Sequence, residues 1–124
     1  KRLAYAADRI LGEPTLLAHI KDINLGGSRI TDAGLRTLLE MLGDQTGGPF
    51  LERPRTAWIN LKLGRTAITD EGLRAFFGWS VFKLLDLNST EITDSGLEHI
   101  KKLKRLEYLD LSGTKVTDAG VAEL

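Results

Sequence analysis

Two aspartates that stand 24 residues apart, Asp86 and Asp110, are the residues of this chain best placed to attract a cation. Each lies between two leucines, so strand alternation would put both carboxylates on the face opposite the leucines. On neighbouring strands, about 4.8 Å apart, the carboxylates repel each other unless Lys62 or a cation of a partner offsets their charge. Two carboxylates fall short of the six or more oxygens that calcium prefers, so we expect no metal site.

The same alternation places an apolar pair, Leu84 and Tyr108, beside the aspartates. Tyrosine and leucine supply contact area in protein interfaces, while carboxylates select arginine or lysine on a partner. The candidate partner-binding residues are therefore Leu84, Asp86, Tyr108, Asp110, Lys62, Asn60 and Asn88. An ordinary hydrated strand face with nothing bound is an equally open interpretation, because single exposed tyrosines are common.

Residues that could carry catalysis or hold a cofactor form no recognisable motif. His19 and His99 have no serine or aspartate at a spacing that builds a triad within one unit, and the sequence around His99 is not His-Glu-x-x-His. The Gly-Gly pairs lack the Gly-Lys-Ser/Thr ending of a phosphate loop. The chain has no cysteine, hence neither a disulfide framework nor a thiol nucleophile. We expect no enzymatic activity and no cofactor.

The aspartates belong to a unit that occurs four times along the chain. Its copies begin at Asp22, Asn60, Leu85 and Leu109, and equivalent positions are separated by steps of 38, 24 and 24 residues. A period of this size is the mark of a solenoid. Within each copy, leucines that alternate with polar residues predict a strand of about three to five residues with one face in the core.

Two polar columns separate each predicted strand from a predicted helix. A small hydroxyl residue, expected to bond the backbone of its own or a neighbouring turn, recurs as Ser28, Thr66, Thr90 and Thr114. The aspartate of Thr-Asp-x-Gly, expected to be the N-cap of the helix, recurs as Asp32, Asp70, Asp94 and Asp118. After Asp94, the residues Leu97, Ile100 and Leu103 are spaced by three and make one apolar helical stripe.

No unit of strand, turn and short helix can bury its apolar side alone, so the units must stack into one parallel sheet with helices on the other side. The pattern L-x-L-x-x-T-x-I-T-D-x-G-L resembles the leucine-rich repeat family, in a bacterial-type variant, over about residues 20–124. The resemblance implies an α/β leucine-rich repeat solenoid, a curved right-handed stack with short parallel strands on the concave face and helices on the convex face. It also implies that the concave face binds another protein.

The expected organisation is a helical cap followed by four repeats, at residues 1–19, 20–57, 58–81, 82–105 and 106–124. The first repeat is 14 residues too long, and its glycines and prolines assign the excess to a loop at about 43–55. Phe50 and Leu51 of this loop are expected to fold back over neighbouring helices, with a docking loop as the alternative. The last repeat is truncated, so we expect the chain to continue there or to meet a second copy.

Aromatic residues gather in the second repeat. Trp58 and Phe76 are expected in the core, because they align with apolar positions of the third repeat. Phe77 aligns with Lys101, which should face solvent. Either the long loop covers Phe77 and Trp79, or these residues form an exposed apolar patch that marks an interface. We favour the covered arrangement, since the oversized loop and the oversized residues are close together.

Charge and hydropathy narrow the classes of partner. Lysine plus arginine and aspartate plus glutamate number 17 each, so no bulk field draws the chain to nucleic acid or anionic lipid. No apolar run approaches the roughly 18 residues of a membrane span, and no signal-peptide pattern assigns a compartment. The sequence thus favours a protein-interaction module, with a structural spacer or self-associating segment of a longer repeat protein as the alternative.

Overall fold

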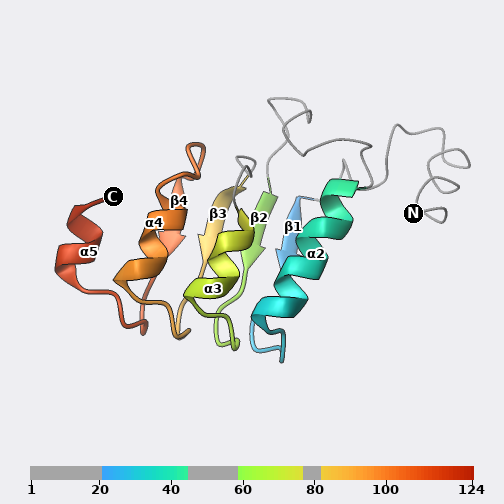
Figure 1. Cartoon of the computed structure of the whole chain (residues 1–124), viewed down its shortest axis with the longest axis horizontal. Helices are drawn as coiled ribbons and strands as arrows, with labels where there is room; N and C mark the ends of the chain where they lie inside the picture. Colours follow the sequence, from blue (N-terminus) through green and yellow to red (C-terminus); the bar gives the residue numbers. More distant parts are fainter. Residues whose placement is uncertain (1–20, 45–58, 77–81) are drawn as a thin grey trace, which may run out of the picture.

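The structure is a computed structural model that describes residues 21–44, 59–76 and 82–124 (Figure 1). The elements, in chain order, are β1 (Asp22–Asn24), α2 (Asp32–Asp44), β2 (Ile59–Lys62), α3 (Asp70–Leu73), η3 (Arg74–Phe76), β3 (Phe82–Asp86), η4 (Asp94–Gly96), α4 (Leu97–Ile100), β4 (Tyr108–Asp110) and α5 (Asp118–Ala122). Each predicted unit is therefore a strand, a turn and a helical segment. No helix of the described ranges is long and apolar enough to cross a membrane.

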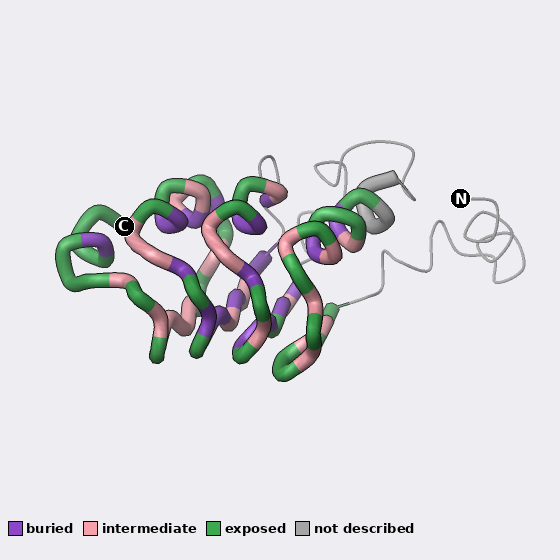
Figure 2. The backbone as a smooth tube through the Cα atoms, turned by 60° about the horizontal axis from the view of Figure 1, so that its bottom comes forward, coloured by how far each residue is buried: buried purple, intermediate pink, exposed green. Residues whose placement is uncertain are grey.

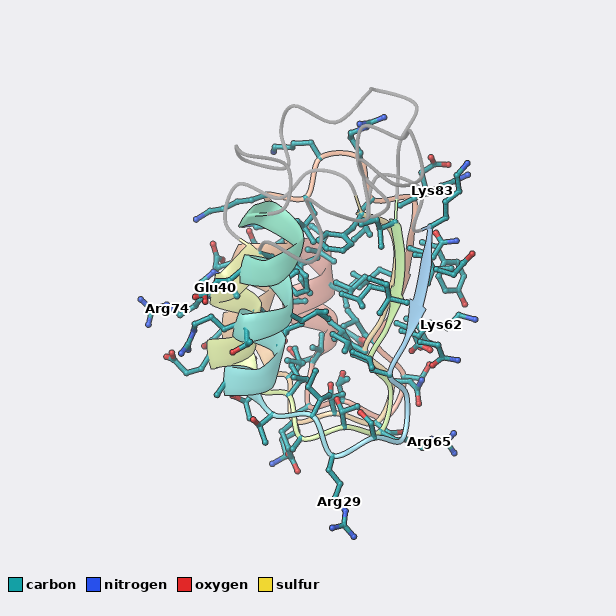
Figure 3. The ribbon with its side chains drawn as sticks, turned by 90° about the vertical axis from the view of Figure 1, so that its right-hand side faces the viewer. Arg29, Glu40, Lys62, Arg65, Arg74 and Lys83 are labelled. Atoms are coloured by element: carbon teal, nitrogen blue, oxygen red, sulfur yellow. The ribbon has the colours of Figure 1, made fainter. Side chains whose placement is uncertain are left out.

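The four strands form one parallel sheet in the order β1-β2-β3-β4, and the helices lie in a row over one of its faces (Figure 1). Consecutive units are neighbours in space because each returns the chain to the start of the next strand. The predicted α/β repeat solenoid is confirmed. No helix of the described residues lies on the opposite face of the sheet (Figure 3).

The core lies between the sheet and the helices, where the alternating leucines of the strands meet the apolar stripes of the helices. Leu85 and Leu87 of the third unit are fully buried, and the stripe Leu97, Ile100 and Leu103 faces them with at most 4% of each residue exposed. In Figure 2 the buried stretches recur at equivalent places in successive units. Burial of these side chains is the main force that holds one unit against the next.

The small hydroxyl column behaves as the sequence predicts, within single turns. The hydroxyl groups of Thr66, Thr90 and Thr114 each donate to the carbonyl three residues earlier, at 2.6, 2.7 and 2.6 Å. These bonds satisfy carbonyls that the end of the strand leaves without a ladder partner.

The prediction that aspartates cap the helices was wrong. The N-caps are the preceding threonines: Thr69, Thr93 and Thr117 have extended backbones, and their hydroxyl groups accept from amides two or three residues later. The reason is that the aspartate is already the first helical residue. Its carboxylate therefore does not lie where an N-cap side chain accepts from the first free amides of the helix. It bonds the next unit instead.

The pairing of β2 with β3 shifts register at the start of β2. Ile59 pairs with Phe82 and Asn60 pairs with Leu84, so β3 holds one extra residue at this point. Ile59 is fully buried and belongs to the core. A bulge of this kind changes the residue count without changing the faces of the strand beyond it.

Several predictions fall outside the described residues. These are the helical cap at 1–19, most of the loop at 43–55 with its Phe50 and Leu51, and the aromatic residues Trp58, Phe77 and Trp79. The helix α2 continues to Asp44 and so includes the first two residues of the predicted loop. Phe76 is confirmed as a core residue and packs edge to face on Phe82, with 5.0 Å between ring centroids.

Candidate functional site

The candidate site is the helix-free side of the sheet, called here the strand face. Parallel pairing aligns its residues in two rows that cross the strands. The first row is Asp22, Asn60, Leu84 and Tyr108, and the second is Asn24, Lys62, Asp86 and Asp110. Lys62 projects from this side in Figure 3, whereas Arg74 and Glu40 project from the helices opposite.

The apolar pair of the first row lies side by side, as the sequence predicts. Leu84 pairs with Tyr108 in the sheet, so the two side chains are direct neighbours. Tyr108 is 56% exposed and Leu84 is half-buried. An exposed tyrosine beside a leucine offers a partner a contact area that costs little side-chain entropy to order.

The two aspartates of the second row are engaged by their own chain. Asp86 Oδ1 accepts from the backbone N–H of Asn88 at 3.0 Å and from its side-chain Nδ2 at 2.6 Å. Asp110 Oδ1 accepts from the backbone N–H of Ser112 at 2.9 Å and from its hydroxyl group. Both hydrogen bonds from Ser112 lower the pKa of Asp110, the bond from the hydroxyl more than the bond from the N–H. The turn donors of Ser112 thereby stabilise the charged form of Asp110.

Lys62 does not neutralise the aspartates by a direct ion pair. It is aligned with Asp86 in the sheet, yet no salt bridge joins Lys62 to a carboxylate among the residues that the structure describes. Its exposed ammonium group is therefore available to a partner.

The two asparagines of the predicted site are fixed in place by neighbours. Asn60 Nδ2 donates to Asp22 Oδ1 at 2.9 Å across the first two strands. The side chain of Asn88 lies over Gly64, where an added Cβ would stand only 2.2 Å from Nδ2. Only glycine leaves room for this amide, so Asn60 and Asn88 serve first to order the face.

The sequence analysis missed this turn chemistry, although a signal for it was present. Asn24, at the head of the second row, accepts from the N–H of Gly26 at 3.0 Å in the same way as the aspartates. A side-chain oxygen that accepts from the amide two residues later is a known preference of asparagine and aspartate at turns. The recurrence of Asn or Asp just before the last leucine of three units was that signal.

Side chains that could hold a metal ion do not gather in the described ranges. These ranges contain no group of three or more histidine, cysteine, aspartate or glutamate side chains that could hold a metal ion. His99 is half-buried on α4, on the helix side, while His19 lies outside the described residues. The basic run that ends the third unit is largely exposed, and Lys101 pairs with Glu98 at 3.5 Å.

Comparison with known sequences identifies the repeat. A family model described as "Leucine Rich repeat" matches residues 17–39, 60–77, 81–101 and 103–124. Each match includes most or all of one strand and at least the first part of the helical segment that follows it. No curated protein matches the chain.

Proposed function

We propose that this chain, which belongs to the leucine-rich repeat family, binds a protein partner through its strand face. Repeats of this family serve in general as protein-interaction modules rather than as enzymes. The observation that carries the proposal is the pair formed by exposed Tyr108 and half-buried Leu84, beside hydrogen-bonded polar residues.

The chemistry of the face specifies the kind of partner. Tyr108 and Leu84 form the contact that loses water on binding, and such central aromatic contacts dominate interface energies. Asp86 and Asp110 each use Oδ1 for their own turn, and Oδ2 makes no hydrogen bond within the described residues. We expect an arginine or lysine of the partner at these outer oxygens and an acidic group opposite Lys62.

The test begins with affinity capture from a lysate of the source organism and continues with the purified partner. Binding of the recombinant partner is measured by calorimetry against the parent chain and against the double variant Leu84→Arg/Tyr108→Ala. We expect the double variant to bind at least about a hundredfold more weakly, because it loses the central contact and adds a buried charge.

The matched control is Glu71→Ala/Arg74→Ala on the helix side. This pair forms an exposed salt bridge of 3.2 Å between α3 and η3, so its removal leaves the strand face intact. Circular dichroism confirms that each variant is folded. A partner that binds the strand-face variant as tightly as the parent would overturn the proposal. If the partner binds the strand-face variant but not the helix-side control, the binding site lies on the helices instead.

A further inference from the structure

The turn that follows each strand holds one residue in the left-handed backbone region. Glycine occupies this place in the first and fourth units, where Gly27 and Gly113 have φ of 73° and 69°. Arg65 and Ser89 occupy it in the two middle units, both with φ of 55°. Residues other than glycine are strained at such angles. A strained arginine is therefore a reason to ask what its side chain does.

The backbone of Arg65 is fixed on both sides, while its side chain is not engaged. Its N–H donates to the carbonyl of Asn88 in the next unit at 2.8 Å, and the hydroxyl of Thr66 donates to the carbonyl of Leu63 at 2.6 Å. Arg65 is exposed, and its guanidinium group forms no ion pair with a described residue. The turn thus presents the guanidinium group to solvent from a fixed point.

Lys62 lies on the same side of the molecule as Arg65. Both side chains project away from the helices, on the side of the strand face (Figure 3). They are three residues apart in one unit, so a single ligand group can contact both. The neighbouring turn of the first unit leaves space there: the N–H of Gly27 donates to the carbonyl of Gly64, and a Cβ on Gly27 would meet no atom within 4 Å.

These two cations give the strand face an electrical polarity. Asp86 is aligned with Lys62 in the sheet, and Asp110 is aligned with Asp86. The second unit therefore presents positive charge, whereas the third and fourth units present negative charge. A surface of this kind favours a partner with the opposite arrangement and disfavours the same partner turned around.

We propose that Lys62 and Arg65 form an anion subsite that binds an aspartate or glutamate side chain of the protein partner. The subsite rests on the function proposed above, and it adds Arg65 to the strand face. A guanidinium group can donate two parallel N–H bonds to a carboxylate, and the ammonium group of Lys62 adds a further donor. A singly charged carboxylate suits two cations beside Asp86 better than a doubly charged phosphate does.

The subsite also sets a distance within the partner. A basic group of the partner at Asp86 or Asp110 lies one or two strand spacings from Lys62. The acidic and basic groups of the partner should therefore be about 5–10 Å apart.

The test is an NMR titration of the full ¹⁵N-labelled chain at low salt. The probe is the capped peptide acetyl-Glu-Gly-Glu-amide, and its neutral counterpart is acetyl-Gln-Gly-Gln-amide. We expect the acidic peptide to shift the amide signals of Lys62 and Arg65 and the neutral peptide to leave them unchanged. Arg65→Gly and Lys62→Ala should each bind the acidic peptide at least about threefold more weakly.

Two variants serve as controls. Ser89→Gly makes the same backbone change in the equivalent turn of the next unit, and Arg29→Gln removes a positive charge that projects from the turn in another direction (Figure 3). Both should bind the acidic peptide like the parent. Because glycine relieves the strain at this φ, Arg65→Gly should unfold at a urea concentration no lower than the parent, which separates lost binding from lost structure.

Three results would overturn the subsite: signals that do not shift, an Arg65→Gly variant that binds like the parent, or equal shifts with the neutral peptide. Inorganic phosphate that shifts the same signals at lower concentration than the acidic peptide would overturn it too, because the site would then suit a free anion. The strand-face proposal is decided separately, by the purified partner and Leu84→Arg/Tyr108→Ala. A partner that requires Leu84 and Tyr108, together with a peptide that binds regardless of Arg65, would remove the subsite alone.

Discussion

Asp70 holds Thr93 of the following unit with both of its carboxylate oxygens. Oδ1 accepts from the backbone N–H at 2.9 Å, and Oδ2 accepts from the hydroxyl at 2.5 Å. The hydroxyl oxygen of Thr93 in turn accepts from the N–H of Ser95 and caps its own helix. One carboxylate thereby fixes where the next helix begins relative to the previous one.

Replacing Asp70 with alanine should destabilise the chain by about 2 kcal/mol, because two charge-assisted hydrogen bonds between units are lost. Urea unfolding at neutral pH, at a protein concentration below any self-association, measures the change in the free energy of unfolding.

Asp118→Ala is the matched control for this substitution. Asp118 occupies the same first-turn position but bonds to no described residue, so any helix-dipole effect is shared between the two variants. We expect a loss below about 0.5 kcal/mol at Asp118. Equal losses at the two aspartates would show that the effect lies within the helix rather than between units.

Gly96→Ala should also destabilise the chain, although alanine favours a helix over glycine by about 1 kcal/mol. A Cβ at this position would stand 2.4 Å from Asp70 Oδ1, so the carboxylate must leave its site. The cost should shrink markedly in a background that already carries Asp70→Ala, since the two residues act on one contact. A double-mutant cycle of unfolding free energies measures this coupling, and strict additivity would contradict the packing argument.

Acid should weaken the equivalent contact between Asp94 and Thr117. Both hydrogen bonds from Thr117 lower the pKa of Asp94 below the ordinary aspartate value, the bond from the hydroxyl more than the bond from the N–H. A folded-state pKa below the unfolded value of about 3.9 means that the stabilisation is present above that pH and is lost as pH falls through the folded pKa.

Thr117→Val removes the hydroxyl donor and should raise the pKa of Asp94 towards its ordinary value. NMR titration of the Asp94 carboxyl carbon provides the measurement. This readout separates the carboxylate bond from the helix cap that Thr117 also provides, because loss of a cap alone leaves the pKa of Asp94 low. An unchanged titration curve would refute the assignment.

Leucines at equivalent strand positions should differ in their contribution to stability according to their place in the stack. Leu85→Ala removes a fully buried side chain between two flanking units and should cost about 3 kcal/mol, including the cavity it leaves. Leu109→Ala should cost about half as much, because Leu109 is only half-buried. Thermal unfolding of the two variants provides the comparison, and equal losses would indicate that the end unit is covered in solution.

The arrangement of the strand face was largely predictable from the sequence. Side chains alternate along any strand, and Lys62, Asp86 and Asp110 stand at intervals of 24 residues, so parallel pairing had to align them. The same argument aligned Leu84 with Tyr108. It did not predict that Ile59 pairs with Phe82, because a bulge adds a residue to one strand and sequence periodicity does not reveal where such a register shift occurs.

The sequence by itself determined the repeat, its strand and helix periods and the residues that share a face, because these follow from local geometry and regular spacing. Tertiary structure alone decided what the polar residues of Thr-Asp-x-Gly do. Threonine and aspartate both cap helices well, so adjacent copies of the two cannot be told apart by propensity. Only the position of the next unit shows that Asp70 bonds Thr93 and that Gly96 leaves it room.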